Sequence, residues 1–329
     1  MWRAGALGWI LAAACAAPSA RLYTTVAVTD GVARGAVAVG GAPRVLGVVA
    51  HPDDEFSFAG ALFKTATHLG GACALVTITD GQGGFKYATF AEALHGLPLT
   101  EESTGRRELP AVRRAEQLES SRLLGLTRLY YLNQPDHRYT TDLSEVLGAH
   151  AEVWDLDAVA RALDEVLAQG RFDFVLVHPP TVTTHAHHQA ATLLALEAVL
   201  RLPPAQRPVV LCAEVESGPD NGPPWLAPAA VERCAAAQLA AGPFTFDRAQ
   251  SFGYRNQLDY RLVIDAAIGR HVSQGTMLRL MGQGTREEYW VLGEVDAAQE
   301  ARVRGWFERL AEPQYPGRDY GPSAGVVPR

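Results

Sequence analysis

The sequence predicts a doubly wound α/β fold: a mostly parallel, Rossmann-like sheet with helices on both faces. Short apolar, β-branched segments alternate along the chain with longer segments of helical periodicity. The apolar segments are nearly continuous, which is typical of strands that are buried on both faces. Hydrophobic residues make up 48% of the 329 residues, so the chain can bury a core. In such a fold we expect the active site at the carboxyl ends of the strands.

The strands and helices alternate in order along most of the chain. Strands are expected at residues 45–50, 73–79, 128–132, 172–177 and 209–213, and helices between them at residues 55–69, 111–124, 156–168 and 188–202. Residues 82–106 and 133–153 lack clear periodicity, and we expect them to be long loops that border the substrate cleft. Near the C-terminus a strand is expected at residues 260–264, with helices at residues 266–277 and 297–310.

The N-terminus has the pattern of an export signal. Arg3 precedes an apolar run at residues 6–17, which Pro18 ends. This run is shorter than the roughly 20 residues that a membrane-spanning helix needs, so no transmembrane span is expected. We therefore expect residues 1–20 to be a signal segment and the protein to be periplasmic or secreted. A lipoprotein anchored through Cys15 is the alternative, although the residues before it favour soluble export.

Charge and cysteine content exclude some classes of partner and scaffold. The chain has 29 Lys and Arg against 36 Asp and Glu, a formal charge of −7, and no basic run, so nucleic acid is not an expected partner. Cys73, Cys212 and Cys234 are too few and too scattered for a disulfide framework, and they include no CxxC pair. We assign them no chemistry.

The first chemically informative segment is residues 48–55, where an apolar strand ends in a histidine followed by acidic residues. Acidic side chains stabilise a helix N-terminus, which accounts for one or two of Asp53, Asp54 and Glu55. It does not account for His51 at the strand end, nor for three adjacent like charges, whose repulsion favours a bound cation. The segment therefore predicts a metal site that includes His51 and Asp54.

A second cluster follows the strand expected at residues 172–177. His185 and His188 are three residues apart and should share one face of a first helical turn, whereas His187 should point elsewhere. Alone, a histidine-rich turn is as often a solvated loop as a metal site. Two such clusters at equivalent strand ends are more specific, and together they predict one shared site.

These residues resemble a known family. The segment Ala50-His51-Pro52-Asp53-Asp54-Glu55 and the later pair His185 and His188 are similar to the PIG-L/LmbE-type de-N-acetylases, zinc hydrolases that remove acetyl from N-acetylglucosamine-containing molecules. Shorter similarities occur at Thr79-Asp80-Gly81, Arg113 with Glu116, Asp136, and His271-Val272-Ser273-Gln274. The resemblance spans about residues 44–275, which we place in a single domain at residues 21–312, followed by a Pro- and Gly-rich tail at residues 313–329.

The chain departs from the family pattern at two places. Gln82 stands where the family often has Glu, and residues 185–188 read His-Ala-His-His where the family usually has HPDH. The HxxH spacing is kept. The departures therefore weaken the expectation for the substrate more than that for the chemistry.

The resemblance implies His51, Asp54 and His188 as ligands of Zn2+, in agreement with the chemical argument. Two imidazoles and one carboxylate leave a coordination position for water, as in catalytic zinc sites. Asp53 would then act as the general base and His185 would stabilise the oxyanion if it is protonated. Either of these two could protonate the leaving amine.

Two further residues match family positions that contact sugar hydroxyls. Arg113 and Asp136 are therefore expected to bind substrate, although Arg113 could instead lie on a solvated helix face and Asp136 could cap a turn. Glu55 is expected to begin the helix or to orient a ligand. Tyr87, Tyr139 and Phe85 are candidates for stacking on a sugar ring.

The sequence as a whole indicates an exported, metal-dependent hydrolase of an N-acetylated amino sugar, a small-molecule or glycan substrate. Fe2+ could replace zinc, because two histidines and one carboxylate also form the facial triad of oxygenases, but the HxxD spacing argues against an oxygenase. A non-catalytic glycan-binding protein with this fold, and an amidase of a different conjugate, such as a thiol conjugate, are the alternatives. The sugar and the oligomeric state are left open.

Overall fold

A computed structural model describes residues 22–28, 41–216 and 222–314 of the chain. The expected signal segment at residues 1–20, with Cys15, and residues 315–329 of the expected tail lie outside the described residues. The domain boundaries expected at residues 21 and 312 stay predictions.

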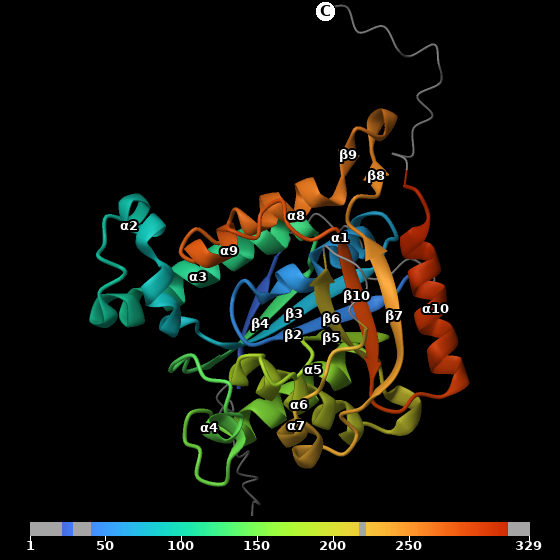
Figure 1. The fold of residues 1–329 in the computed structure, drawn as a ribbon, viewed down its shortest axis with the longest axis horizontal. Helices are drawn as coiled ribbons and strands as arrows, with labels where there is room; N and C mark the ends of the chain where they lie inside the picture. The colour runs from blue at the N-terminus through green and yellow to red at the C-terminus, as the bar shows by residue number, and fades with distance from the viewer. Residues whose placement is uncertain (1–21, 29–40, 217–221, 315–329) are drawn as a thin grey trace, which may run out of the picture.

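In the described part of the chain, eight strands form one mixed sheet in the order β1-β4-β3-β2-β5-β6-β10-β7 (Figure 1). Their bounds are β1 (Thr24–Ala27), β2 (Arg44–Val49), β3 (Ala72–Thr79), β4 (Arg128–Gln134), β5 (Phe174–Val177), β6 (Val209–Glu216), β7 (Leu239–Asp247) and β10 (Arg286–Leu292). Strands β4, β3, β2, β5 and β6 are parallel, whereas β1 and β10 pair antiparallel with their neighbours. The predicted doubly wound, mostly parallel sheet is confirmed.

Helices cover both faces of this sheet (Figure 1). One face packs on α5 (Leu156–Gly170), α6 (Ala186–Arg201) and α7 (Pro228–Arg233), and the other on α1 (Ala59–Thr67), α3 (Glu102–Leu124), α8 (Tyr260–Ile268) and α10 (Ala297–Ala311). The remaining elements are short: α2 (Thr89–His95), α4 (Ser144–Leu147), α9 (Gly275–Leu278), and the two-stranded sheet of β8 (Ser251–Phe252) and β9 (Leu258–Asp259). None of the described helices is long and apolar enough to cross a membrane.

Each central strand contributes to the core on both faces. In β2, Leu46 and Val48 join the apolar cluster beneath α5 and α6, whereas Val45 and Val49 join the cluster beneath α1. Alternate side chains of a strand point to opposite faces, so a strand covered on both faces needs apolar residues at consecutive positions. This requirement produces the continuous apolar runs of the sequence.

The strand order places a crevice at the carboxyl ends of the central strands β2 and β5. The chain moves outward from β2 through β3 to β4, and then returns to β5, which pairs with β2 in parallel register from Val45 with Phe174 to Gly47 with Leu176. The reversal of direction between β2 and β5 separates the loops that follow them. Ligands of open α/β sheets bind at such switch points, outside the carboxyl ends of the strands.

Three expectations about local structure are wrong. Residues 266–277 are not one helix, because α8 ends at Ile268 and α9 begins at Gly275. Residues 260–264 are not a strand but the start of α8, because the Asp259 carboxylate accepts a hydrogen bond from the Leu262 N–H (3.4 Å) and Tyr260, Ile264 and Ile268 are buried at helical spacing. Residues 82–106 are not an irregular loop, because they contain α2 and the first turn of α3.

The strands β1, β7 and β10 were not expected from the sequence. Helix α3 also begins at Glu102 rather than near residue 111 and continues through Pro110, whose missing N–H removes one hydrogen bond of the helix. β1, β7 and α3 have weak local patterns because much of each is exposed, whereas β10 is buried but begins with the charged residues Arg286, Glu287 and Glu288. Packing on the rest of the domain determines their conformation.

Candidate metal centre

The loop after β2 is folded into a tight, strained turn. The backbone N–H of His51 donates to Asp54 Oδ2 (2.7 Å), and Asp54 begins the 3₁₀ helix η1 (Asp54–Phe58). Between them, Asp53 has φ 128° and ψ −19°, a conformation that costs an L-residue about 1–3 kcal/mol. Two contacts hold it: the Asp53 N–H donates to Glu55 Oε2 (3.2 Å), and Arg113 Nη2 donates to the carbonyl of Pro52 (2.6 Å).

The structure brings the three expected ligands together from two loops. His51 Nδ1 lies 3.0 Å from His188 Nε2 and 3.4 Å from Asp54 Oδ2, and His188 Nε2 lies 3.3 Å from Asp54 Oδ1. Donor atoms bound to one tetrahedral zinc ion at its usual bond lengths are separated by about 3.3–3.6 Å. The donor set and its spacing therefore fit one divalent ion.

The electrostatics of this triad also favour a cation. Burial acts to lower the pKa of His51, but the Asp136 and Asp54 carboxylates outweigh it and raise the pKa to about 10. Although burial opposes it, the neighbouring His188 and His51 hold the pKa of Asp54 well below its usual range. Burial lowers the pKa of His188 to about 3, so its imidazole is neutral at neutral pH and able to bind a metal.

Asp53 lies beside the triad without joining it. Its Oδ2 forms a buried ion pair with Arg113 Nη2 at 3.1 Å, and Arg113 Nη1 donates to the Gly81 carbonyl (2.8 Å). Burial, with the nearby charge of Asp54, raises the pKa of Asp53 to about 7 against the opposing effect of Arg113. The alternative that Arg113 lies on a solvated helix face is wrong, since the residue is only 2% exposed.

Glu55 supports the turn from behind. Its carboxylate accepts hydrogen bonds from the Gln117 side chain (3.1 Å), the Ser120 hydroxyl (2.9 Å) and His271 Nε2 (2.8 Å). All four residues are buried. Glu55 therefore ties the loop after β2 to α3 and to the segment after α8, and the similarity at His271 has a structural explanation.

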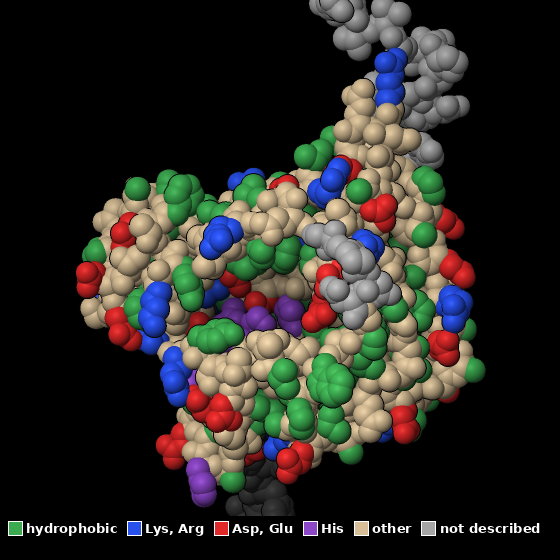
Figure 2. Space-filling view, viewed as in Figure 1, with side chains coloured by type: hydrophobic (Ala, Val, Ile, Leu, Met, Phe, Trp, Pro, Cys, Tyr) green, Lys and Arg blue, Asp and Glu red, His purple; other side chains and the backbone are tan. Residues whose placement is uncertain are grey.

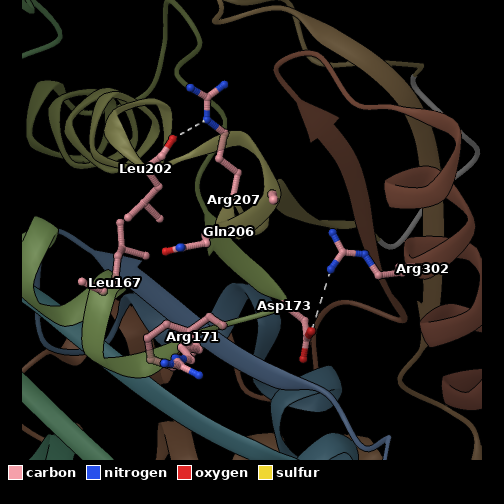
Figure 3. A pocket seen from close by; sticks show the side chains of 10 residues that line it. Leu167, Arg171, Asp173, Leu202, Gln206, Arg207 and Arg302 are labelled. Carbon is pink, nitrogen blue, oxygen red and sulfur yellow. Dashed lines mark hydrogen bonds and ion pairs between the residues drawn. The ribbon is translucent and has the colours of Figure 1, made fainter.

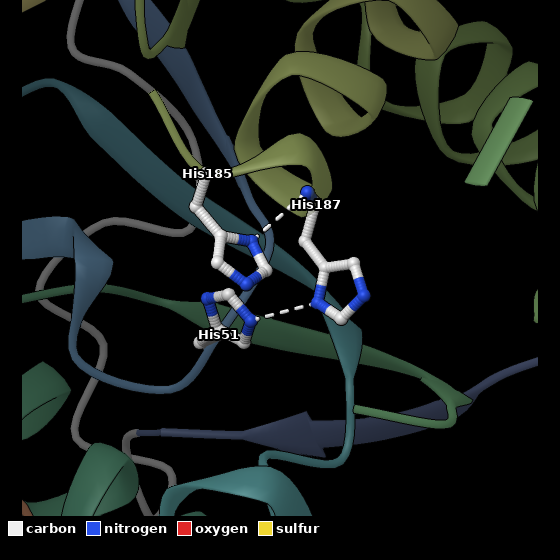
Figure 4. A group of neighbouring side chains, drawn as sticks. All are labelled: His51, His185 and His187. Carbon is white, nitrogen blue, oxygen red and sulfur yellow. Dashed lines mark hydrogen bonds between the residues drawn. The ribbon is translucent and has the colours of Figure 1, made fainter. Parts of the chain in front are cut away.

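The rings of His185 and His187 lie next to the ring of His51 (Figure 4), and the His188 ring also contacts it. His185 precedes α6, and its Nδ1 accepts a hydrogen bond from the backbone N–H of His187 (3.0 Å). The proton of its neutral ring is therefore on Nε2, which donates to the Arg138 carbonyl (3.2 Å). Burial lowers the pKa of His185 to about 4, so the residue is a neutral hydrogen-bond donor rather than the protonated group considered from the sequence.

The expectation that His187 points away from the site is wrong. Its Nδ1 lies 3.0 Å from His51 Nε2, and its side chain is fully buried. The ring of His51 lies against the first turn of α6, so residues on two sides of that turn reach it. No feature of the local sequence indicates this contact, because it depends on how β2 and β5 are paired.

Asp136 follows β4 and faces the same histidines. Its Oδ1 lies 3.7 Å from His51 Nε2 and 3.5 Å from His187 Nδ1, and its Oδ2 accepts a hydrogen bond from the Gly83 N–H (3.1 Å). A Cβ at Gly83 would lie 2.7 Å from the Asp136 carboxylate and would displace it. Asp136 also lines the cavity, and its role in substrate binding stays a prediction.

A cavity of about 230 Å3 opens in front of these groups. Its lining includes Asp53, Arg113 and His185, with Tyr87 and Tyr139 among its aromatic residues. Phe85 does not line it but is buried in a small apolar cluster with Leu99 and Leu109. The space-filling view shows the histidines at the bottom of a hollow bordered by acidic and basic side chains (Figure 2).

A second cavity, of about 410 Å3, lies at the opposite edge of the sheet, near the amino end of β5 (Figure 3). Arg302 there faces Asp173 at 4.0 Å, and Arg207 donates to backbone carbonyls. No histidine lines this cavity. Among the described residues, the groups with ligand atoms spaced for a metal all lie in the first cavity or directly beside it.

Comparisons with known proteins agree with the sequence resemblance. The family model described as GlcNAc-PI de-N-acetylase, PIG-L, matches residues 46–199. A curated relative, 1D-myo-inositol 2-acetamido-2-deoxy-alpha-D-glucopyranoside deacetylase 2 from Saccharopolyspora erythraea, is 32% identical over 186 residues. The match covers 55% of this chain and 61% of that relative, so the chain spans less than two thirds of its length.

The solved structures that the chain matches include deacetylases. A triple mutant of a deacetylase of the teicoplanin biosynthetic pathway has a TM-score of 0.50 and 18% identity, and the match covers 77% of this chain and 99% of that chain. The N,N'-diacetylchitobiose deacetylase from Pyrococcus horikoshii has a TM-score of 0.42 and 20% identity, covering 77% and 85% of the two chains. The match to the teicoplanin-pathway deacetylase, at 18% identity, supports the fold alone.

Proposed function

We propose that the chain is a metal-dependent hydrolase that removes the N-acetyl group from an N-acetylglucosamine-type amino sugar or its conjugate, since the PIG-L family model matches residues 46–199. The observation that carries the proposal is the convergence of His51, Asp54 and His188 on one point, with Asp53 beside them and free of the triad. The relative that acts on a 2-acetamido-2-deoxyglucopyranoside supports the substrate class.

In this proposal His51, Asp54 and His188 hold a zinc ion. When bound, such an ion polarises a carbonyl and makes water more acidic, so that a nucleophile exists near neutral pH. Fe2+ fits the same donors, and the choice between the two metals belongs to the test.

The protein's own groups then move the protons. Asp53 accepts a proton from the attacking water as the C–O bond to the acetyl carbon forms. When the C–N bond breaks, acetate leaves and the sugar amine gains a proton, which Asp53 can return. Arg113 holds the Asp53 carboxylate at 3.1 Å, which limits its rotation and keeps it directed at the cavity.

His185 stabilises the negative charge that develops on the acetyl oxygen. Its Nε2–H is directed to the Arg138 carbonyl and its side chain lines the cavity, so it can exchange that acceptor for a substrate oxygen. A neutral N–H group that points at an oxyanion stabilises it through a hydrogen bond and keeps its own proton. Tyr87 and Tyr139, which are 45% and 68% exposed, are placed to contact the sugar ring.

The experiment is a metal and amine-release assay. Purified protein is stripped with a chelator and reloaded with zinc or iron, and free amine is measured from N-acetylglucosamine and from its inositol and glycan conjugates. We expect release only with metal bound, at most background release from Asp53→Ala, and no oxygen consumption. Activity that persists after complete metal removal would overturn the proposal, and glycan binding without any amine release would favour a binding protein.

We also propose that the protein is exported, as its first residues indicate. Expression of the full chain with a C-terminal tag and N-terminal sequencing of the mature product test this. Cleavage near residue 20 supports soluble export, whereas lipid attached at Cys15 indicates an anchored form. An intact N-terminus in the cytoplasmic fraction contradicts export.

A further inference from the structure

The two ring nitrogens of His51 face opposite sides of the site. Nδ1 faces His188 and Asp54, the other two expected ligands, at 3.0 and 3.4 Å. Nε2 faces His187 Nδ1 at 3.0 Å, with Asp136 Oδ1 farther away at 3.7 Å. A neutral imidazole carries one proton, so a histidine that presents Nδ1 to a metal must carry that proton on Nε2.

The hydrogen bonds continue from His187 toward the surface. His187 Nε2 lies 2.9 Å from His137 Nδ1, and His137 Nε2 lies 3.4 Å from Glu145 Oε2. The Glu145 carboxylate also accepts hydrogen bonds from Thr140 Oγ1 (2.9 Å) and Arg138 Nη2 (2.7 Å). Three imidazoles and one carboxylate therefore form a single chain that begins at a predicted metal ligand.

The carboxylate at the end of this chain sets the direction of its three hydrogen bonds, since Asp136 Oδ1 lies farther from His187 Nδ1 (3.5 Å) than His51 Nε2 does (3.0 Å). An ionised carboxylate only accepts, so His137 must donate to Glu145 through Nε2–H. His137 Nδ1 is then an acceptor, which requires His187 to donate through its own Nε2–H. His187 Nδ1 is in turn an acceptor, and the proton between it and His51 belongs to His51 Nε2. When a metal takes the place of the proton on His51 Nδ1, the lone pair of that nitrogen faces the metal.

We propose that His187 is a positioning residue that, with His137 and Glu145, holds His51 in the tautomer and orientation needed to bind the metal through Nδ1. The inference rests on the metal site of the proposed function. Metal-binding histidines usually donate their other N–H to a carboxylate or carbonyl, and losing such a partner weakens metal binding. Here a neutral imidazole, itself held by a second imidazole, takes that place.

The chain offers a variant that separates this role from simple packing. The His187 ring lies beside Trp154, with ring centroids 5.2 Å apart. His187→Phe keeps an aromatic ring in that space and removes the acceptor, whereas His187→Asn places an amide oxygen close to the former Nδ1. His95→Phe, an exposed histidine of α2 outside the site, serves as the matched control.

The test measures zinc binding directly, in the absence of substrate. Competition with a chromophoric chelator gives the Kd, and we expect His187→Phe to weaken zinc binding roughly 10- to 100-fold, while His187→Asn and His95→Phe remain close to wild type. In zinc-loaded protein with 15N-labelled histidine, NMR should show His51 protonated at Nε2. In His187→Phe, this proton should exchange faster with solvent.

Three results would overturn the inference. An unchanged Kd in a folded His187→Phe protein would show that Asp136 alone is sufficient. A proton on His51 Nδ1 would contradict the direction of the chain. Two zinc ions per chain, with the second lost in His187→Phe, would make His51, His185 and His187 ligands of another ion. These measurements do not depend on turnover, so they can support the inference even if the protein releases no acetyl group. Amine release by a protein whose Kd for zinc is unaffected by His187→Phe would overturn the inference but not the proposed function.

Discussion

A buried charge pair behind the metal centre provides the sharpest test of the structure. Glu287 on β10 and Arg248 are both fully buried and lie 3.0 Å apart. The Glu287 carboxylate also accepts hydrogen bonds from the backbone N–H groups of Gly60 (2.7 Å) and Ala61 (3.0 Å), at the start of α1, and from the Tyr289 hydroxyl (2.6 Å). It therefore holds the helix that follows the loop of His51 and Asp54.

Glu287→Gln changes almost no volume but removes the charge and replaces one acceptor oxygen with a donor. The new amide group must face two of the four donors, and Arg248 is left as an uncompensated buried cation. Breaking a buried pair in this way costs about 3–5 kcal/mol, a large part of the roughly 5–15 kcal/mol that stabilises a typical domain. We expect the free energy of unfolding to fall by that amount.

Urea denaturation followed by tryptophan fluorescence measures the loss. The control is Glu300→Gln on α10, which removes an exposed pair with Arg304 (2.9 Å) and should cost less than about 1 kcal/mol. In a double-mutant cycle with Arg248→Met, part of the loss should be recovered, because no unpaired charge remains. A loss below about 1 kcal/mol for Glu287→Gln would refute the assignment of these two residues as a charged pair in the core.

The other predictions concern the candidate site and its support. Asp53→Asn should lower kcat by about 10²–10⁴ while the metal content, measured by mass spectrometry, stays at the wild-type value, and loss of the metal would instead make Asp53 a ligand. Burial acts to lower the pKa of His271, but the Glu55 carboxylate outweighs burial and raises it. This histidine therefore stabilises the fold fully below its unfolded pKa of about 6.5, and the stabilisation is lost as pH rises through its folded pKa. The difference in Tm between wild type and His271→Asn should therefore be largest in mild acid and shrink in alkali, and a difference that grows with pH would contradict the pairing. Gly60→Ala should destabilise by about 1–3 kcal/mol in urea, because its Cβ would lie 2.4 Å from the Phe246 ring, and equal stability would show that this contact relaxes freely.

Some features of this protein follow from local sequence. Continuous apolar runs reveal the parallel strands, because a strand covered on both faces must be apolar at consecutive positions. The metal-binding residue types at two strand ends predict a site at the carboxyl edge of the sheet, since parallel strands end at a common edge. Exposed segments are harder to predict, because periodicity in the sequence reflects buried side chains. α2, β7 and much of α3 have few buried side chains.

Other features depend on which strands become neighbours, and no local pattern encodes that choice. His51 and His188 are 137 positions apart and meet only because β5 returns to pair with β2. The same pairing places His187 against His51. Glu55 meets His271 across 216 positions through the packing of α3 and the segment after α8. The sequence by itself determined the donor types and the edge of the sheet where they gather, whereas the tertiary structure decided which nitrogen faces which partner, because hydrogen-bond direction depends on distances set by the whole fold.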